Sequence, residues 1–81
     1  MSPFGPWSTG ISPAERLARL RSMRALALIY CRTSTDFISA LERAETDADA
    51  LPAAFNELEC IPALQRRHLL ATFLNLISRT Q

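Results

Sequence analysis

The sequence predicts an all-α fold, a small bundle of three or four helices behind an extended N-terminal arm. Both glycines of the 81-residue chain lie within its first ten residues. Residues 14–51 contain neither glycine nor proline and are rich in Ala, Leu, Arg and Glu, which favour helices. A chain of this length buries only about 60–65% of its unfolded surface. We therefore expect one domain, residues 12–81, with residues 1–11 as the arm.

The arm contains two prolines and two glycines, a pattern typical of extended or polyproline-like backbone. It also carries Phe4 and Trp7, two of the six aromatic residues in the chain. Two interpretations are open. Either these rings fold back and cover the chain's own core, or they dock into a groove on another protein, as aromatic anchors commonly do. The second interpretation makes Phe4 and Trp7 candidate partner-binding residues.

The strongest local signal is the sequence SPAE at residues 12–15. The Ser12 hydroxyl is placed to accept a hydrogen bond from the backbone N–H of Glu15, whose carboxylate can reach back to the N–H of Ser12. Proline suits the first helical position, because the N–H that it lacks would be unpaired there. This capping box predicts a helix over residues 13–32.

A polar run, TSTD at residues 33–36, is the place where this helix is expected to be interrupted. Ser, Thr and Asp have poor helix propensity and cap helices well, so we expect Ser34 or Thr35 to cap a second helix over residues 35–50. A single continuous helix over residues 13–50 is the alternative. Apolar residues recur in the second half at the spacing of an amphipathic helix: Phe37, Leu41, Ala44, Ala48 and Leu51.

Two prolines divide the rest of the chain. Pro52 disfavours helical geometry at Leu51 and therefore ends the second helix. A short helix is expected over residues 52–59, with Phe55 and Leu58 facing inward. Pro62 then opens the last helix, over residues 62–79.

The last helix is apolar over an unusually wide arc. Its polar stripe is narrow and consists of Gln65, His68, Thr72, Asn75 and Arg79. At about 100° per residue, its apolar residues spread over roughly 200° of the remaining arc. An ordinary surface helix has an apolar stripe of about 100°. We therefore expect a second chain, either another copy or a different protein, to contact this helix. The candidate contact residues are Leu70, Phe73, Leu74 and Ile77. The alternative is a central core helix in a monomer.

Charge is segregated along the chain. Residues 12–32 carry five arginines and one glutamate, residues 36–59 carry seven acids and one arginine, and residues 60–81 carry three arginines and no acid. Antiparallel helices with this distribution attract one another, and Glu15 precedes Arg19 in the favourable i,i+4 order.

The alternative interpretation of the arginines is a nucleic-acid surface. Its candidate phosphate contacts are Arg16, Arg19, Arg21 and Arg24. These four residues spread over roughly 200° of the helix, and no aromatic residue alternates with them for base stacking. Because the net charge is only +1, a nucleic acid is the less favoured partner.

Residues that carry catalysis or bind metals are few. The chain has no lysine, one histidine and two widely separated cysteines, Cys31 and Cys60. This inventory is too small for a typical Cys/His zinc site and builds no catalytic triad. We expect no enzyme activity, no metal and no cofactor. Both cysteines stand beside apolar residues, so we expect them to be reduced thiols in the core, in a reducing compartment.

No apolar run approaches the roughly 20 residues that a membrane span requires, and no secretory signal is evident. We expect a cytoplasmic location, with an organelle matrix as the alternative. The predicted function is a non-enzymatic protein–protein interaction module, a small regulator or accessory subunit that associates through its last helix. The alternatives are a nucleic-acid-associated regulator and a purely structural subunit of a larger assembly. No small-molecule substrate is evident.

Overall fold

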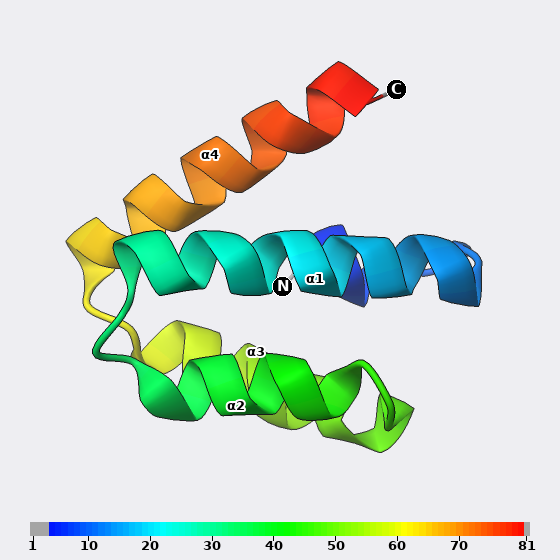
Figure 1. Cartoon of the computed structure of the whole chain (residues 1–81), viewed down its shortest axis with the longest axis horizontal. Coiled ribbons are helices and arrows are strands. Elements are labelled where there is room, and N and C mark those ends of the chain that lie inside the picture. Colours follow the sequence, from blue (N-terminus) through cyan, green and yellow to red (C-terminus); the bar gives the residue numbers. More distant parts are fainter. Residues whose placement is uncertain (1–3, 81) are drawn as a thin grey trace.

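Helices make up nearly all of the regular structure. The computed structural model describes residues 4–80, and of residues 77–80 the backbone alone. Within this range there is no strand, and the all-α prediction is confirmed (Figure 1). The four α-helices are α1 (Pro13–Tyr30), α2 (Thr35–Ala44), α3 (Leu51–Cys60) and α4 (Ala63–Thr80). A 3-10 turn, η1 (Gly5–Trp7), lies in the arm, and a second one, η2 (Ala48–Ala50), leads into α3.

The first helix begins at the predicted capping motif. The Ser12 hydroxyl accepts a hydrogen bond from the Glu15 N–H at 3.1 Å. The Glu15 carboxylate turns to Arg19 instead of Ser12, with Oε1 2.9 Å from Nε, so the expected i,i+4 ion pair is present. The helix ends two residues earlier than predicted. Cys31 has the non-helical angles φ −132° and ψ 45°, and its N–H donates to the Ala27 carbonyl at the end of the helix.

Two helices, and not one, occupy the stretch after Pro13. A turn separates α1 from α2, in which the Ser34 N–H donates to the Cys31 carbonyl at 2.9 Å. A continuous helix over residues 13–50 is therefore wrong. Ser34 stands at the N-cap position of α2, but its side chain makes no capping hydrogen bond. The break therefore depends on the turn and not on the predicted side-chain cap.

The second helix ends at Ala44, well before residue 50. Asp47 adopts an extended conformation, with φ −140°, and its Oδ1 accepts a hydrogen bond from the Asp49 N–H at 3.0 Å. An Asp side chain that binds a nearby backbone N–H in this way competes with helical hydrogen bonding. Leu51 has helical angles, φ −58° and ψ −46°, so the expectation that Pro52 disrupts it is wrong. Pro52 lies in the first turn of α3, where a backbone N–H would have no hydrogen-bond partner within the helix, so the lack of this N–H costs nothing.

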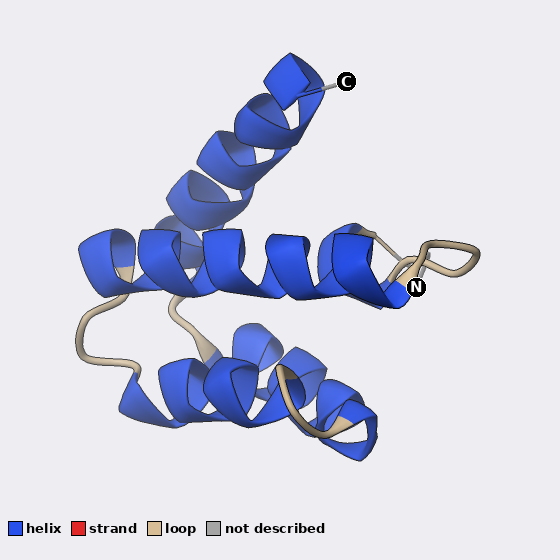
Figure 2. Cartoon of the chain, turned by 45° about the vertical axis from the view of Figure 1, so that its right-hand side comes forward, coloured by secondary structure: helices blue, strands red, loops and turns tan. Residues whose placement is uncertain are grey.

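The helices pack on both sides of α1. The α2–α3 pair lies on one side and α4 on the other, and α4 starts beside the last turn of α1 and then leaves it at an angle (Figures 1 and 2). The radius of gyration is 11.6 Å, close to the roughly 12 Å of a compact chain of this length. No described helix is long and apolar enough to cross a membrane.

The core draws on every helix. Its largest fully buried side chains are Leu20, Met23, Phe37, Leu41, Leu69 and Phe73. Of the stripe predicted for the second helix, Phe37, Leu41 and Ala44 are buried, whereas Ala48 is exposed and Leu51 is half-buried. Ala48 is exposed because the chain leaves helical geometry before it, so the helical spacing no longer applies there.

Candidate protein-interaction surface

The N-terminal arm folds back onto its own chain. The rings of Phe4 and Trp7 meet Phe55 of α3, with centroids 5.1 to 6.3 Å apart. The Trp7 indole N–H donates to the Leu51 carbonyl at 2.8 Å. The structure therefore has the first of the two arrangements expected for the arm. Both rings are half-buried against this chain, and their docking into a groove on another protein remains a prediction.

On the side of α4, the ring of Phe73 lies against Gly5 of the arm. The Phe73 side chain is 0% exposed. A Cβ added to Gly5 would lie 2.7 Å from Cε2 of Phe73, and Gly5 has a φ of +54°, in the region that favours glycine. In this structure the arm therefore covers Phe73, so its ring offers no accessible surface to a partner. We call the arm cluster the following residues: Phe4, Gly5, Trp7, Phe55 and Phe73.

Two arginines of α1 bind the backbone of the arm. Arg16 Nη1 donates to the carbonyls of Pro6 at 2.8 Å and of Ser8 at 3.1 Å. Arg19 Nη1 donates to the Gly5 carbonyl at 3.1 Å. Hydrogen bonds from a charged donor are stronger than those between neutral groups. These arginines therefore hold the arm in place.

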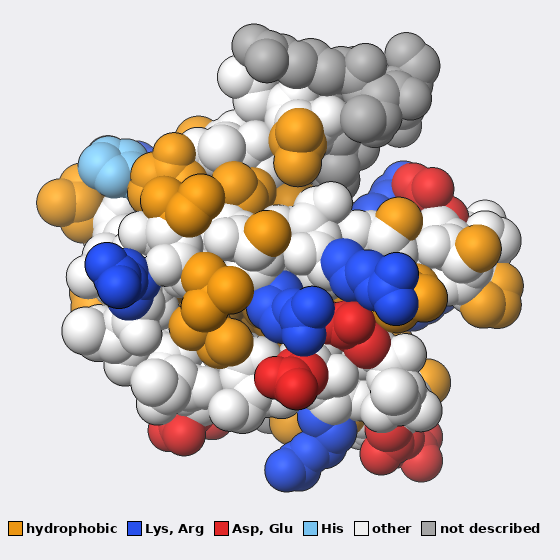
Figure 3. Space-filling view, in the orientation of Figure 1, with side chains coloured by type: hydrophobic (Ala, Val, Ile, Leu, Met, Phe, Trp, Pro, Cys, Tyr) orange, Lys and Arg blue, Asp and Glu red, His pale blue; other side chains and the backbone are white. Residues whose placement is uncertain are grey.

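Two further arginines of α1 bind the end of α2. Arg21 Nε lies 3.4 Å from Glu45 Oε1, and Arg24 Nη1 lies 3.2 Å from Glu45 Oε2. The Glu45 side chain is only 11% exposed, so the contact is partly shielded from water. Positive and negative side chains alternate along this boundary (Figure 3). The expected attraction between the arginine-rich first helix and the acidic second helix is present.

The four arginines predicted to contact phosphate are all engaged within the chain. The four arginines all bind groups of their own chain: Arg16, Arg19, Arg21 and Arg24. The structure does not bring them together on one free face, in agreement with their wide spread around the helix. Ion pairs with Glu15 and Glu45 account for Arg19, Arg21 and Arg24, and carbonyls of the arm account for Arg16.

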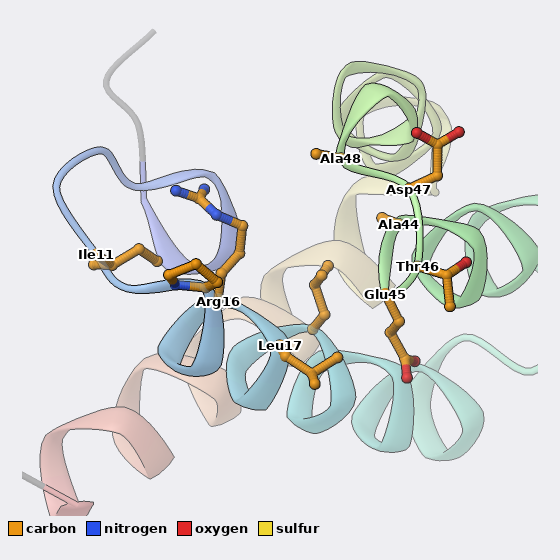
Figure 4. Close-up of a pocket in the computed structure, with 10 residues that line it drawn as sticks. Ile11, Arg16, Leu17, Ala44, Glu45, Thr46, Asp47 and Ala48 are labelled. Atoms are coloured by element: carbon orange, nitrogen blue, oxygen red, sulfur yellow. The ribbon is translucent and has the colours of Figure 1, made fainter.

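A groove lies between the N-terminal half of α1 and the turn after α2 (Figure 4). It has a volume of about 330 Å³, and apolar residues such as Ile11 and Leu17 line it together with charged ones. The Arg16 guanidinium binds the arm and the Glu45 carboxylate binds α1. The Asp47 carboxylate points away from both and accepts from the Asp49 N–H. Each charged group that lines the groove therefore already has a partner within the chain.

The two cysteines lie in different surroundings. Cys31 is buried, and this burial raises the pKa of its thiol. Cys60 is exposed at the end of α3, so the expectation that it lies in the core is corrected; its neighbour Ile61 is buried there instead. Both thiols are free. Among the described residues, no three His, Cys, Asp or Glu side chains come together in a way that could hold a metal ion.

Large apolar side chains remain exposed at the end of α1 and along α4. Leu28, Ile29 and Tyr30 of α1 are 53%, 66% and 37% exposed, and Leu64 and Leu76 of α4 are 64% and 39% exposed. Figure 3 shows apolar side chains gathered over the first half of α4 and the adjoining half of α1.

The residues of α4 in this region form one ridge. Residues four apart on a helix line up as a ridge, and Leu64, Thr72 and Leu76 share such a row with His68. The Thr72 hydroxyl lies 3.4 Å from the hydroxyl of Tyr30, which joins the ridge to α1. We call the α1–α4 patch the following residues, of which Leu28 and Tyr30 lie about 160° apart around α1, one on each side of Ile29: Leu28, Ile29, Tyr30, Leu64, His68, Thr72 and Leu76.

The other predicted contact residues of the last helix lie away from this ridge. Leu70 is half-buried and packs against the core. Leu74 is 51% exposed, but at 100° per residue it lies about 160° around α4 from Leu76. The side chain of Ile77 lies outside the described residues. The structure therefore does not unite the predicted set on one free face.

Sequence reasoning missed the α1 half of the patch. The apolar run from Ala25 to Cys31 looks like core, and Ala27 and Cys31 are indeed buried. Seven consecutive apolar residues, however, point to every side of a helix, whereas a helix on the surface of a small bundle buries only one side. This excess was the available signal that residues 28–30 would stay exposed.

Two arginines border the patch. Arg32 follows the end of α1, and Arg67 stands one turn after Leu64 on α4; both are exposed. Among the described residues, neither has an ion-pair partner. Residues 16–35 and 60–81 contain no Asp or Glu, so the segments that carry the patch contribute no negative side chain to it. The patch therefore combines exposed apolar surface with unpaired positive charge.

Comparisons of the chain with protein-family models, with curated proteins and with solved structures find no match in any of the three. The function therefore has to be inferred from the residues of this chain and their arrangement.

Proposed function

We propose that this chain is a non-enzymatic protein-interaction module, a small regulator or accessory subunit, whose partner covers the α1–α4 patch. The observation that carries the proposal is the exposure of Leu28, Ile29 and Leu64, each more than half accessible, at the end of α1 and on α4. Removing a side chain of this kind from water is worth about 1.5–3 kcal/mol. Apolar surface concentrated in one place on a small domain is typical of a site of association.

The charged and aromatic groups elsewhere support the same choice of surface. The arm cluster already has its partners within the chain, so its rings offer little surface to a second protein. Leu28 and Ile29 belong to an end of α1 that the arm does not reach. The proposal therefore rests on the α1–α4 patch, and not on the arm or on Phe73.

The observations favour this function over nucleic-acid binding. The four candidates on α1 are engaged with the arm or with Glu45, and they spread around the helix and do not form one phosphate-binding face. A purely structural subunit of a larger assembly would bind through the same apolar patch. This alternative differs from the proposed function only in the activity of the assembly that it joins. We further propose a reducing compartment such as the cytoplasm, because the two cysteines are free thiols.

The experiment compares two variants of the full chain as baits in extracts of the cells that make it. Ile29→Glu places a charge in the centre of the patch, and Ala53→Glu places the same charge on the exposed surface of α3. We expect the wild type and Ala53→Glu to retain a protein that Ile29→Glu loses. Light scattering of the purified chain shows whether that protein is a second copy. Retention of the same proteins by all three baits, together with an unchanged mass, would contradict the proposal.

A further inference from the structure

We infer that the partner segment that covers the α1–α4 patch is acidic as well as apolar: an amphipathic segment of another protein whose Asp or Glu side chains meet Arg32 and Arg67. This inference rests on the proposed function and adds the chemistry of the partner. Complementary charge around an apolar contact selects the partner and raises the rate of encounter.

The structure divides the arginines into two groups. Most of them bind groups of their own chain: Arg16, Arg19, Arg21, Arg24 and Arg66. Arg32 and Arg67 are exposed and without an ion-pair partner among the residues described, and these two border the patch. Arg43 on α2 is also exposed and without an ion-pair partner, so two of the three arginines of this kind among the residues described border the patch.

The acids nearest to Arg32 are Asp36, four residues further along the chain, and Glu57, which lines a small pocket together with Asp36 and Thr33, and neither forms an ion pair with Arg32. After Glu15, the next acid in the sequence is Asp36 and the last is Glu59, so these acids belong to the segment that forms α2 and α3. That pair of helices packs on the opposite side of α1 from α4 (Figure 1). In Figure 3 the acidic side chains in view lie over α2 and toward the beginning of α1, away from the patch. No described acid forms an ion pair with Arg32 or Arg67, so both guanidinium groups remain available to carboxylates of a partner.

A second copy of the chain does not supply them through this surface. In a two-fold symmetric dimer the same patch lies on both sides of the contact. Arg32 and Arg67 would then face a surface with the same positive charges and no carboxylate. A contact between this patch and the acidic side of another copy would not be symmetric, and such contacts form open chains unless the rotation closes. A different protein fits the patch better.

A lipid surface is also less suited to the patch. Recognition of anionic lipids typically uses clusters of about four to eight basic residues. Here only two unpaired arginines border the apolar side chains. Two discrete charges suit two carboxylates at fixed positions on a protein segment better than a diffuse negative surface.

The experiment titrates the full chain with three labelled synthetic helical peptides and follows fluorescence anisotropy. The peptides share their apolar positions and carry Glu, Gln or Lys at the flanking positions. We expect the Glu peptide to bind roughly tenfold more tightly than the Gln peptide and the Lys peptide to bind most weakly, since each exposed ion pair contributes a few-fold. The preference for Glu should diminish as salt is added.

Charge variants decide whether the two arginines cause the preference. Arg32→Glu with Arg67→Glu should reverse the order of the peptides, and Arg32→Gln with Arg67→Gln should make them equal. Arg43→Glu, an exposed arginine on α2 that also has no ion-pair partner among the described residues, is the matched control and should change nothing.

Three outcomes would overturn the inference. Equal binding of the three peptides, lost in Ile29→Glu, would leave the proposed function standing and remove the acidic partner. Binding of none of them would also refute the inference, while the capture experiment judges the proposed function separately. Finally, tighter binding to vesicles of equal parts phosphatidylcholine and phosphatidylserine than to the Glu peptide, lost in the double Glu variant, would identify a membrane as the occupant.

Discussion

The two ends of α1 differ in how far their apolar and charged side chains are covered by the rest of the chain. At the N-terminal end, the rings of the arm cluster pack on one another, and Arg16 and Arg19 bind the carbonyls of the arm. At the C-terminal end, Leu28 and Ile29 remain more than half exposed, and Arg32 has no ion-pair partner within the described part of the chain. A short segment of the same chain covers the first end, whereas among the residues described no segment covers the second.

This difference teaches that residue type alone does not reveal which surface is free. Phe4, Trp7 and Arg16 look like binding residues in the sequence, yet each is satisfied within the chain. Ile29 looks like core and is the most exposed of the large apolar residues described. Each prediction below tests one side of this contrast.

The largest effect is expected at the centre of the covered end. Phe73→Ala removes a fully buried ring and should lower the free energy of unfolding by about 3–5 kcal/mol. Leu76→Ala, also on α4 but in the α1–α4 patch, should cost less than about 1 kcal/mol. Urea denaturation followed by circular dichroism measures both values. Equal losses would show that the arm does not cover α4 as described.

The next largest effect is expected at Gly5, where comparison with Gly10 distinguishes a steric contact from backbone strain. Gly5→Ala forces a side chain against the Phe73 ring at a positive φ and should cost about 2–4 kcal/mol. Gly10→Ala is the control, because Gly10 has a φ of +77° but no atom within 4 Å of the added Cβ. It should cost only the strain of about 1–2 kcal/mol. If the two variants are equally stable, the contact between Gly5 and Phe73 is not present in solution.

A smaller effect is expected from the bonds that hold the arm. Arg16→Ala leaves the carbonyls of Pro6 and Ser8 without their charged donor and should cost about 1–2 kcal/mol, somewhat less than a fully buried bond of this kind. The fluorescence of Trp7, the only tryptophan, should shift to longer wavelength as the arm loosens. Arg32→Ala should change stability by less than about 0.5 kcal/mol and leave the emission unchanged. An unchanged emission in Arg16→Ala would argue against its role in the arm.

The smallest effect concerns the two thiols. Burial raises the pKa of Cys31 in the folded chain, so deprotonation favours the unfolded chain. The contribution of Cys31 to stability is complete below the ordinary thiol pKa and is lost as the pH rises through the raised pKa of the folded state. Cys31→Ala should therefore reduce the loss of stability at alkaline pH, whereas Cys60→Ala should not. In the native chain, a thiol reagent should modify Cys60 first; faster modification of Cys31 would contradict its burial.

The helices were largely predictable because their signals are local. The SPAE motif sets the start of α1, and Pro62 marks the start of α4, where its carbonyl accepts from the Arg66 N–H at 3.0 Å. The end of α2 was not predictable from hydrophobic spacing, which continues unbroken to Leu51. There the N–H groups of Thr46 and Asp47 both bind the Arg43 carbonyl, and the Asp47 side chain then accepts from the Asp49 N–H in place of helical bonding.

The candidate site was predictable only in part, because it depends on contacts between residues distant in sequence. Phe73 and Leu76 are both apolar residues of the same helix, and which one is buried depends on where the arm lies. The arginines of α1 are similar in sequence context, but Arg21 and Arg24 have Glu45 within reach and Arg32 does not. Helical periodicity describes one helix at a time and does not contain these contacts.

The most direct test of the contrast between the two ends is photo-crosslinking in the cells that make the chain. The crosslinking residue p-benzoylphenylalanine replaces Ile29 in one variant and Phe4 in the other. We predict that position 29 crosslinks to a second protein, whereas position 4 crosslinks only within its own chain. Crosslinks to another protein from position 4, with none from position 29, would contradict the account.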